Sequence, residues 1–314
     1  MTRTEQAWRG RGLLHWQMTM WCNYSCKYCR QDHSRHSTLE RWPWMDNDVG
    51  NRPPAQSHWA DNAPPELWLR ALESCFKDRR MHIVLTGGEP LLDRKAVSIL
   101  LAGFAVAPWV DTVRIETNAS AQPHLWPVDW SKAEFMVSYH PDEVSRDKFF
   151  RYLDGMLAAG LCVPVVNLVV LPSRVPDLGR TAADLKARGV ALAALPAYGS
   201  AMYYSEDELV ELKRFVPSTD WFFRSGGSTV GRSCLYPSIA YEMNPDGSAS
   251  VACHPEYGNI FDGRLPEGPS SCVPCPHPKC SCMVRYSFLR ELDYNADSTP
   301  LAGYAKRFME LTLC

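Results

Sequence analysis

The chain has 314 residues, of which 46% are hydrophobic and 22% are charged, and its formal net charge at pH 7 is -2. This composition is ordinary for a globular protein with a large core, and the length suggests one large domain and one smaller domain. A near-neutral chain carries no electrostatic footprint for a nucleic-acid backbone, which argues against a nucleic-acid partner.

The segment at residues 1–12 lacks the apolar stretch of a secretory signal, and no apolar run is long enough to span a bilayer. We therefore expect a cytoplasmic protein with no membrane partner. Disulfides are disfavoured in that compartment, so the 12 cysteines of the chain are more plausible as metal ligands.

Strand-like and helix-like segments alternate from residue 13 to about residue 215. Short runs of apolar and β-branched residues predict strands at 13–20, 81–86, 112–116, 134–139, 163–171 and 191–196. Helical periodicity between most of them predicts helices at 66–77, 94–104, 146–159, 176–188 and 206–215. Serial β/α units imply a parallel sheet with crossover helices. We expect an α/β fold, a partial (β/α)6 TIM-type barrel over residues 1–215, followed by a small cysteine-rich domain over residues 216–314.

Three cysteines, Cys22, Cys26 and Cys29, follow the first predicted strand with C-x3-C-x2-C spacing. A tight loop of this kind can place three thiolates on one 4Fe-4S cluster and leave the fourth iron without a protein ligand. A zinc site would need a fourth ligand, which His33 or His36 would supply. Taken alone, the motif favours iron-sulfur over zinc only modestly.

A second motif, Gly87-Gly88-Glu89-Pro90, lies at the end of the second predicted strand. Barrel enzymes place their chemistry on the loops that follow the strands, so this motif and the cysteine loop fall on the same face. Two adjacent glycines let the backbone approach a ligand closely.

The cysteine loop, with the aromatic residue Tyr28 before its last cysteine, and the downstream GGEP sequence together resemble the radical S-adenosylmethionine (radical SAM) superfamily. The resemblance implies a partial barrel whose open iron binds the amino and carboxylate groups of SAM. It also implies that Tyr28 lies near the adenine and that Gly87, Gly88, Glu89 and Pro90 bind the cofactor at its amine.

Polar residues at the ends of the third, fourth and fifth predicted strands are further candidates: Glu116, Asn118, Ser138, His140 and Asn167. The first three match the positions where the superfamily holds the ribose and carboxylate of SAM. The alternative for each is a residue that caps a strand or helix, and this reading is preferred for Asn167. His140 is a candidate general base or substrate hydrogen-bond donor, although a single histidine at a strand end is more often structural.

An insertion at 31–65 separates the cysteine loop from the first predicted helix and contains Trp42, Trp44 and Trp59. Loops of this length are usually functional or disordered, and tryptophans argue against disorder. We expect it to fold over the barrel mouth, either as a substrate lid or as a cover packed on the rim.

The last hundred residues contain the cysteines Cys234, Cys253, Cys272, Cys275, Cys280, Cys282 and Cys314. Alternating segments at 238–243 and 248–252 flank a Pro-Asp-Gly turn and predict a β-hairpin, which would bring Cys234 and Cys253 together. A zinc ribbon that uses His277 is the alternative to an iron-sulfur site.

This cysteine-rich segment resembles the SPASM and twitch extensions of radical SAM enzymes, which carry auxiliary 4Fe-4S clusters. Its C-x2-C-x4-C-x-C run departs from the usual C-x2-C-x5-C-x3-C pattern. The sequence is therefore compatible with either one or two auxiliary clusters. By analogy, Cys234, Cys253 and Cys282 would hold one cluster, and Cys272, Cys275, Cys280 and Cys314 the other. Alternatively, Cys280 or Cys282 is a free thiol that donates a hydrogen atom.

The resemblance implies an enzyme that takes an electron from a donor such as flavodoxin or ferredoxin, cleaves SAM and abstracts hydrogen through a 5'-deoxyadenosyl radical. An auxiliary cluster that accepts the substrate electron would give oxidation, whereas a thiol would give epimerisation. Because Cys22 comes too early for an N-terminal peptide-recognition domain, we expect a small polar metabolite such as an aminocyclitol or sugar. The alternatives are maturation of a ribosomal peptide and a non-catalytic iron-sulfur or zinc protein.

Overall fold

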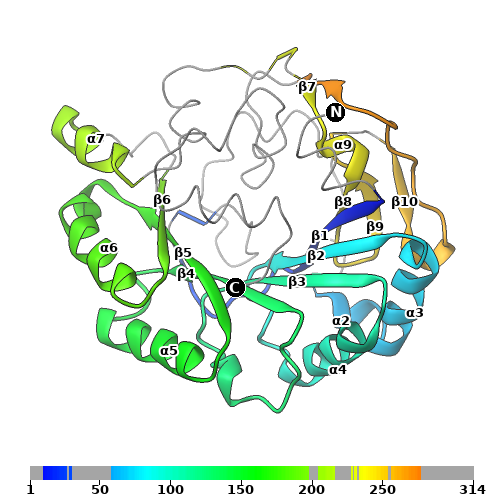
Figure 1. Ribbon diagram of the computed structural model, residues 1–314, viewed down its shortest axis with the longest axis horizontal. Helices are drawn as coiled ribbons and strands as arrows, with labels where there is room; N and C mark the ends of the chain where they lie inside the picture. Colours follow the sequence, from blue (N-terminus) through cyan, green and yellow to red (C-terminus); the bar gives the residue numbers. More distant parts are fainter. Residues whose placement is uncertain are drawn as a thin grey trace.

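Strands β1 to β6 pair in parallel and in chain order within one sheet. The computed structural model describes residues 10–26, 28–29, 58–197, 204–215, 228, 230–231, 233–253 and 256–276. The strands are β1 (Arg11–Thr19), β2 (Arg80–Gly87), β3 (Val110–Thr117), β4 (Ala133–Tyr139), β5 (Cys162–Val170) and β6 (Ala191–Pro196). All six predicted strands are confirmed, and the sheet bends into an open arc, the expected partial barrel (Figure 1).

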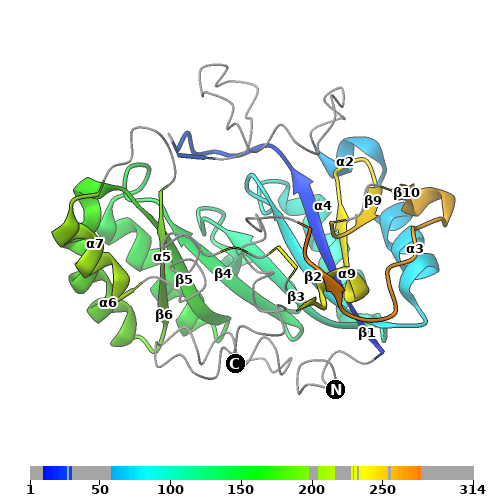
Figure 2. The same ribbon diagram turned by 90° about the horizontal axis from the view of Figure 1, so that it is seen from above.

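Helices cover the outer face of this arc (Figures 1 and 2). They are α3 (Pro65–Phe76), α4 (Arg94–Val106), α5 (Arg146–Ala158), α6 (Leu178–Lys186) and α7 (Glu206–Lys213). Each lies where helical periodicity predicts one, whereas β3 and β4 are joined only by a 3-10 turn, η1 (Pro123–Leu125). A second 3-10 segment, η2 (Pro172–Asp177), replaces the start of the helix predicted at 176–188 because Pro176 cannot donate a backbone hydrogen bond. None of the helices in the described ranges is both long and apolar enough to cross a membrane.

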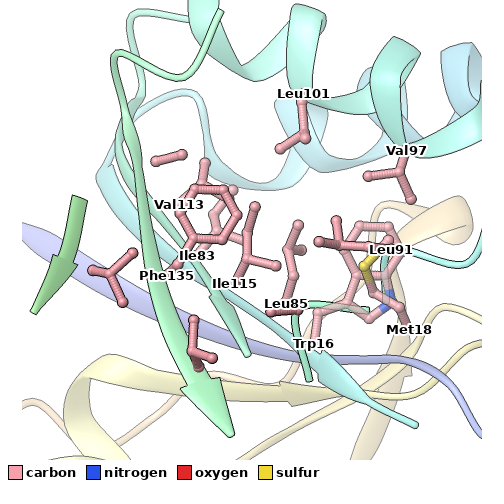
Figure 3. Close-up of a cluster of buried hydrophobic side chains, with 14 of the residues drawn as sticks. Trp16, Met18, Ile83, Leu85, Leu91, Val97, Leu101, Val113, Ile115 and Phe135 are labelled. Atoms are coloured by element: carbon pink, nitrogen blue, oxygen red, sulfur yellow. The ribbon is translucent and has the colours of Figure 1, made fainter. Parts of the chain in front are cut away.

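The core lies between the sheet and the helices. Alternate residues of each strand point outward, so Trp16 and Met18 of β1, and Ile83 and Leu85 of β2, pack against side chains of α4 (Figure 3). All four are fully buried. Burial of a large apolar side chain contributes about 1.5–3 kcal/mol, so this layer is the main stabilising interaction that fixes the strand ends.

The other face of the sheet lines the interior of the barrel and is partly polar. Arg114 of β3 lies in register with Glu134 of β4, and the two form a buried ion pair. His82 of β2, in register with Thr112 of β3, is hydrogen-bonded to it. An apolar layer follows toward the strand ends, formed by Met136, Val165 and Ala193.

The predicted C-terminal hairpin is confirmed, and it joins the barrel sheet. Strand β8 (Ala240–Met243) pairs with β9 (Ser248–Val251) in an antiparallel manner and with β1 in parallel. Among the residues that the structure describes, the sheet therefore has nine strands, in the order β10-β9-β8-β1-β2-β3-β4-β5-β6. The remaining elements are β7 (Ser233–Cys234), α9 (Tyr236–Ile239), β10 (Tyr257–Asn259), η3 (Ile260–Asp262) and β11 (Val273–Pro274).

The end of the insertion packs into the core. The short helix α2 (Trp59–Asn62) buries Trp59 completely, with its ring 5.6 Å from that of Trp16 and 6.1 Å from that of Trp68. Asn62 donates a hydrogen bond of 2.8 Å to the carbonyl of Pro245 in the hairpin turn. Residues 58–65 thus act as a packed cover that joins the barrel to the hairpin. Residues 31–57 of the insertion, including His33, His36, Trp42 and Trp44, lie outside the described residues.

Candidate cluster-binding site

The cysteine loop follows directly after β1, at the carboxyl end of the sheet. Backbone bonds shape it: the amide of Tyr24 donates to the sulfur of Cys22 at 3.4 Å, and the amide of Cys29 donates to the carbonyl of Cys26 at 3.0 Å. Burial raises the pKa of the Cys22 thiol to about 11 and that of Cys26 to about 12, and the neighbouring thiols of the loop add to both shifts. The side chains of Cys22 and Cys26 are therefore protonated at neutral pH without metal, and metal binding would release their protons.

The glycine-rich turn after β2 holds this loop in place. The amide of Gly88 donates to the carbonyl of Thr19, and that of Glu89 to the carbonyl of Trp21, both at 2.7 Å. A Cβ atom on Gly87 would lie 2.2 Å from the oxygen of Thr19, and one on Gly88 would lie 2.0 Å from the oxygen of Trp21. Both glycines are thus required by the approach of the cysteine loop, and any cofactor contact from these two residues would come from their carbonyl groups.

The carboxylate of Glu89 is fully buried and lies between β2 and β3. One oxygen accepts bonds from the amide of Leu91 at 3.1 Å and the hydroxyl of Thr117 at 2.7 Å. The other accepts a bond of 2.6 Å from the amide of Asn118. Burial raises the pKa of Glu89 to about 7, although the three donors oppose this shift. Pro90, the last residue of the motif, is also buried.

Asn118 connects the end of β3 to the cysteine loop. Its side-chain amide donates to Asn23 at 3.0 Å and lies 3.9 Å from the sulfur of Cys22. Asn23 in turn donates to the hydroxyl of Ser120 at 2.9 Å. Asn23 and Ser120 were not expected from the sequence, although an Asn-x-Ser sequence after a strand signals a side-chain-capped turn.

His140, at the end of β4, reaches the same loop from the opposite side. Its Nδ1 atom lies 3.5 Å from the sulfur of Cys26 and 3.0 Å from the hydroxyl oxygen of Tyr28. The His140 ring is nearly parallel to that of Tyr28, at 18°, and meets the ring of Tyr24 edge-on. Burial lowers the pKa of His140 to about 4, so the imidazole is neutral at pH 7.

The other polar candidates lie along the interior face, near the strand ends. Thr86 donates a hydrogen bond of 2.6 Å to the carboxylate of Glu116 on the neighbouring strand. Ser138 of β4 and Asn167 of β5 are in register, and both are partly exposed. These positions lie on strands whose carboxyl ends are at the same edge of the sheet as the cysteine loop and the GGEP turn.

The donor set of the loop fits an iron-sulfur cluster. Its three thiols influence each other electrostatically. The side-chain amide of Asn118 lies next to the sulfur of Cys22, and the Nδ1 atom of His140 lies next to that of Cys26. Hydrogen bonds to cysteine sulfur are a recurring feature of such sites. Within the described residues no three metal-ligating side chains converge as the ligands of one ion would. The cysteines of a cubane cluster need not converge in this way, because each binds a different iron.

A second group of cysteines forms beside the C-terminal hairpin. Cys234 in β7 pairs with Val273 of β11, and the amide of Gly231 donates to the carbonyl of Cys275 at 2.9 Å. Burial raises the pKa of Cys234 to about 12, and the thiols of Cys253, Cys275 and Cys272 raise it further.

Pairing of β7 with β11 brings the C-x2-C sequence of Cys272 and Cys275 next to Cys234. The expected partition, with Cys234, Cys253 and Cys282 on one cluster and Cys272, Cys275, Cys280 and Cys314 on the other, stays a prediction. Cys280, Cys282 and Cys314, together with His277, lie outside the described residues.

No protein-family model matches the sequence, and no curated protein matches it. Solved structures do match it in fold. SuiB of Streptococcus suis bound to S-adenosylmethionine has a TM-score of 0.52 at 14% identity, over 80% of this chain and 63% of that one. Native anSMEcpe with bound AdoMet has a TM-score of 0.54 at 13% identity, over 80% of this chain and 78% of that one.

The chain shares the fold of SuiB and anSMEcpe. It spans less than two thirds of the SuiB chain. At these identities the likeness establishes the architecture, a partial barrel of the TIM type, and leaves the chemistry to the residues of the site.

Proposed function

We propose that this protein is a radical SAM enzyme, with Cys22, Cys26 and Cys29 as the ligands of a 4Fe-4S cluster. The observation that carries the proposal is the position of these three thiols at the carboxyl end of β1, held there by the Gly-Gly-Glu-Pro turn. The fold shared with two S-adenosylmethionine-bound proteins supports it.

Each residue of the site has a role in this proposal. When bound, the cluster would supply one electron, delivered by a donor such as flavodoxin or ferredoxin, for reductive cleavage of SAM to the 5'-deoxyadenosyl radical. The carbonyl groups of Gly87 and Gly88 would bind the amine of SAM, and Tyr28 would lie at its adenine side. Glu116, Asn118 and Ser138 would bind its ribose and carboxylate.

We propose one auxiliary 4Fe-4S cluster held by Cys234, Cys253, Cys272 and Cys275. The electrostatic interaction of the Cys234 thiol with the other three supports it, as does the backbone of Cys253, whose φ of 63° is unusual for a residue other than glycine. A cluster there would accept the electron of a substrate radical, which favours oxidation as the reaction. In that assignment Cys280, Cys282 and Cys314 remain available for a second auxiliary cluster or as a hydrogen-atom donor.

The proposed substrate is a small polar metabolite such as an aminocyclitol or sugar. Peptide maturation is a second candidate, because two proteins that share this fold have been solved with peptides: SuiB with its precursor peptide SuiA, and anSMEcpe with the Cp18Cys peptide. Incubation of the reconstituted enzyme with each substrate class, followed by mass spectrometry, separates a loss of two hydrogens on a sugar from a modified peptide.

Anaerobic reconstitution with iron and sulfide tests the main proposal. We expect SAM and dithionite to yield 5'-deoxyadenosine with the wild-type protein and none with Cys26→Ala. We also expect Cys272→Ala to lose about four iron atoms per chain relative to wild type while the N-terminal cluster remains. Stoichiometric zinc in the N-terminal loop of protein purified without oxygen, or unchanged SAM cleavage in Cys26→Ala, would contradict the proposal.

A further inference from the structure

His140 contacts three residues of the cysteine loop, Tyr24, Cys26 and Tyr28. Its Nδ1 atom is near both the Cys26 sulfur and the Tyr28 hydroxyl, and its ring contacts the rings of Tyr24 and Tyr28. The hydroxyl of Tyr28 also makes a hydrogen bond to Cys26, and this bond lowers the pKa of the Cys26 thiol. Two side chains from distant parts of the chain, those of Tyr28 and His140, thus meet at the sulfur of Cys26.

The hydrogen bonds that can form at the Cys26 sulfur depend on the N–H and O–H groups of His140 and Tyr28. A neutral imidazole has one N–H, and a tyrosine hydroxyl has one O–H. If Cys26 becomes a thiolate ligand, it can only accept hydrogen bonds. If the imidazole proton is on Nδ1, the sulfur can accept both hydrogens, one from the Tyr28 hydroxyl and one from the His140 Nδ1–H. The distance of 3.5 Å from Nδ1 to the sulfur is suitable for such a bond.

We propose that His140 is a positioning residue that donates its Nδ1–H to the Cys26 sulfur in the loaded protein and thereby, together with Tyr28, raises the reduction potential of the N-terminal cluster. The inference rests on the proposed function and assigns His140 a role other than general base. Nδ1 is already engaged with Cys26 and Tyr28, and only Nε2 remains for other partners.

The physical reason is electrostatic. Reduction would add a negative charge to a cluster that is bound by thiolates, of which that of Cys26 is buried. A hydrogen bond to a ligand sulfur stabilises the more negative state. Removing the donor therefore lowers the potential. The position of the donor atom also matters, because only a nitrogen at the site of Nδ1 faces the sulfur.

Variants with an amide side chain at position 140 distinguish the contributions of the two ring nitrogens of His140. In His140→Asn the side-chain NH2 takes the place of Nδ1, whereas in His140→Gln it takes the place of Nε2. His140→Leu keeps the bulk of the ring and removes both nitrogens, and Tyr28→Phe removes the second donor alone. The potential is measured by a reductive titration followed by electron paramagnetic resonance, using the signal that changes on addition of SAM.

We expect the potential to be lower in His140→Leu and His140→Gln than in wild type, to return toward wild type in His140→Asn, and to fall in Tyr28→Phe. If His140→Leu fails to load iron, the rate of iron loss to a chelator is compared between the Asn and Gln variants, and slower loss is expected for Asn. Equal potentials in all loaded variants, or equal iron loss in the Asn and Gln variants, would overturn the inference. A wild-type protein that binds no iron would instead refute the proposed function.

Discussion

The carboxylate of Glu89 accepts the backbone N–H of Asn118 at 2.6 Å and thereby joins the turn after β2 to the end of β3. From Asn118 the connection continues through Asn23 into the cysteine loop. Glu89 is fully buried, and its backbone amide is also bonded to that loop. One residue of the GGEP motif therefore fixes three neighbouring segments at the carboxyl end of the sheet.

Replacing Glu89 with Gln is expected to lower the free energy of unfolding of the metal-free protein by about 1–3 kcal/mol at pH 5. At pH 5 the neutral carboxyl group still has an acceptor lone pair on each oxygen. In glutamine one oxygen can accept from Leu91 and Thr117, but the NH2 group cannot accept and would leave the N–H of Asn118 without an acceptor. Urea unfolding measures the change. Glu73→Gln, on the exposed face of α3, is the matched control and should shift stability by less than about 0.5 kcal/mol. Equal effects of the two variants would contradict the role of the carboxylate.

The raised pKa of Glu89 also predicts that the free energy of unfolding depends on pH. Its pKa in the folded protein is raised from the ordinary value of 4.5 to about 7, so between these pH values the native state binds more protons than the unfolded state. Its contribution to stability is therefore present below pH 4.5 and is lost as the pH rises through 7, by about 3 kcal/mol in all. Glu89→Gln lacks this titration. The stability gap between wild type and Glu89→Gln should narrow from pH 5 to pH 8, and a constant gap would show that the carboxyl group titrates normally.

Much of the fold could be predicted from the sequence, because each barrel element carries its own periodic signal. The strands and outer helices follow from alternating apolar residues and from helical spacing between them, and a Pro-Asp-Gly turn identifies the hairpin. The parallel pairing of β8 with β1 had no such signal. It depends on contacts far apart in the chain, such as the bond from Asn62 to Pro245.

The candidate site could be predicted only in part, for a related reason. Cys22, Cys26 and Cys29 are recognised by their spacing, which is local. The contacts of Cys26 with His140 and of Cys22 with Asn118 join loops on different strands, so spacing could not pair them. The grouping of Cys234 with Cys272 and Cys275 likewise arises from the pairing of β7 with β11, two strands of two residues each that are too short to give a periodic pattern.

Substitution of Trp59 tests how much the packing of residues 58–65 against the barrel contributes to stability. Its ring is fully buried and packs edge-on against those of Trp16 and Trp68, so Trp59→Ala would leave a large cavity and is expected to cost about 3–5 kcal/mol of unfolding free energy. Val106→Ala, at a side chain that is 82% exposed at the end of α4, is the control and should cost less than about 0.5 kcal/mol. Thermal or urea unfolding of both variants gives the comparison. A small loss in Trp59→Ala would mean that the segment at 58–65 is held only loosely on the barrel.

Substitution of Gly88 tests whether the GGEP turn positions the cysteine loop. A Cβ atom in Gly88→Ala would lie 2.0 Å from the carbonyl oxygen of Trp21, and since this is a backbone atom, no side-chain movement relieves the clash. The residue after Trp21 is Cys22, so the backbone shift is transmitted to the first cluster ligand. We expect a lower melting temperature and less iron in the N-terminal site after reconstitution.

Gly179→Ala is the matched control for this substitution. Gly179 lies in α6, where an added Cβ atom meets nothing within 4 Å, so alanine should be neutral or stabilise the helix by up to about 1 kcal/mol. Circular dichroism melts and iron analysis of the two variants, made in parallel, separate a general effect of adding a methyl group from displacement of the loop. Wild-type iron content in Gly88→Ala would show that the cysteine loop keeps its ligand geometry without the close approach of the two turns, and that the glycines serve another purpose.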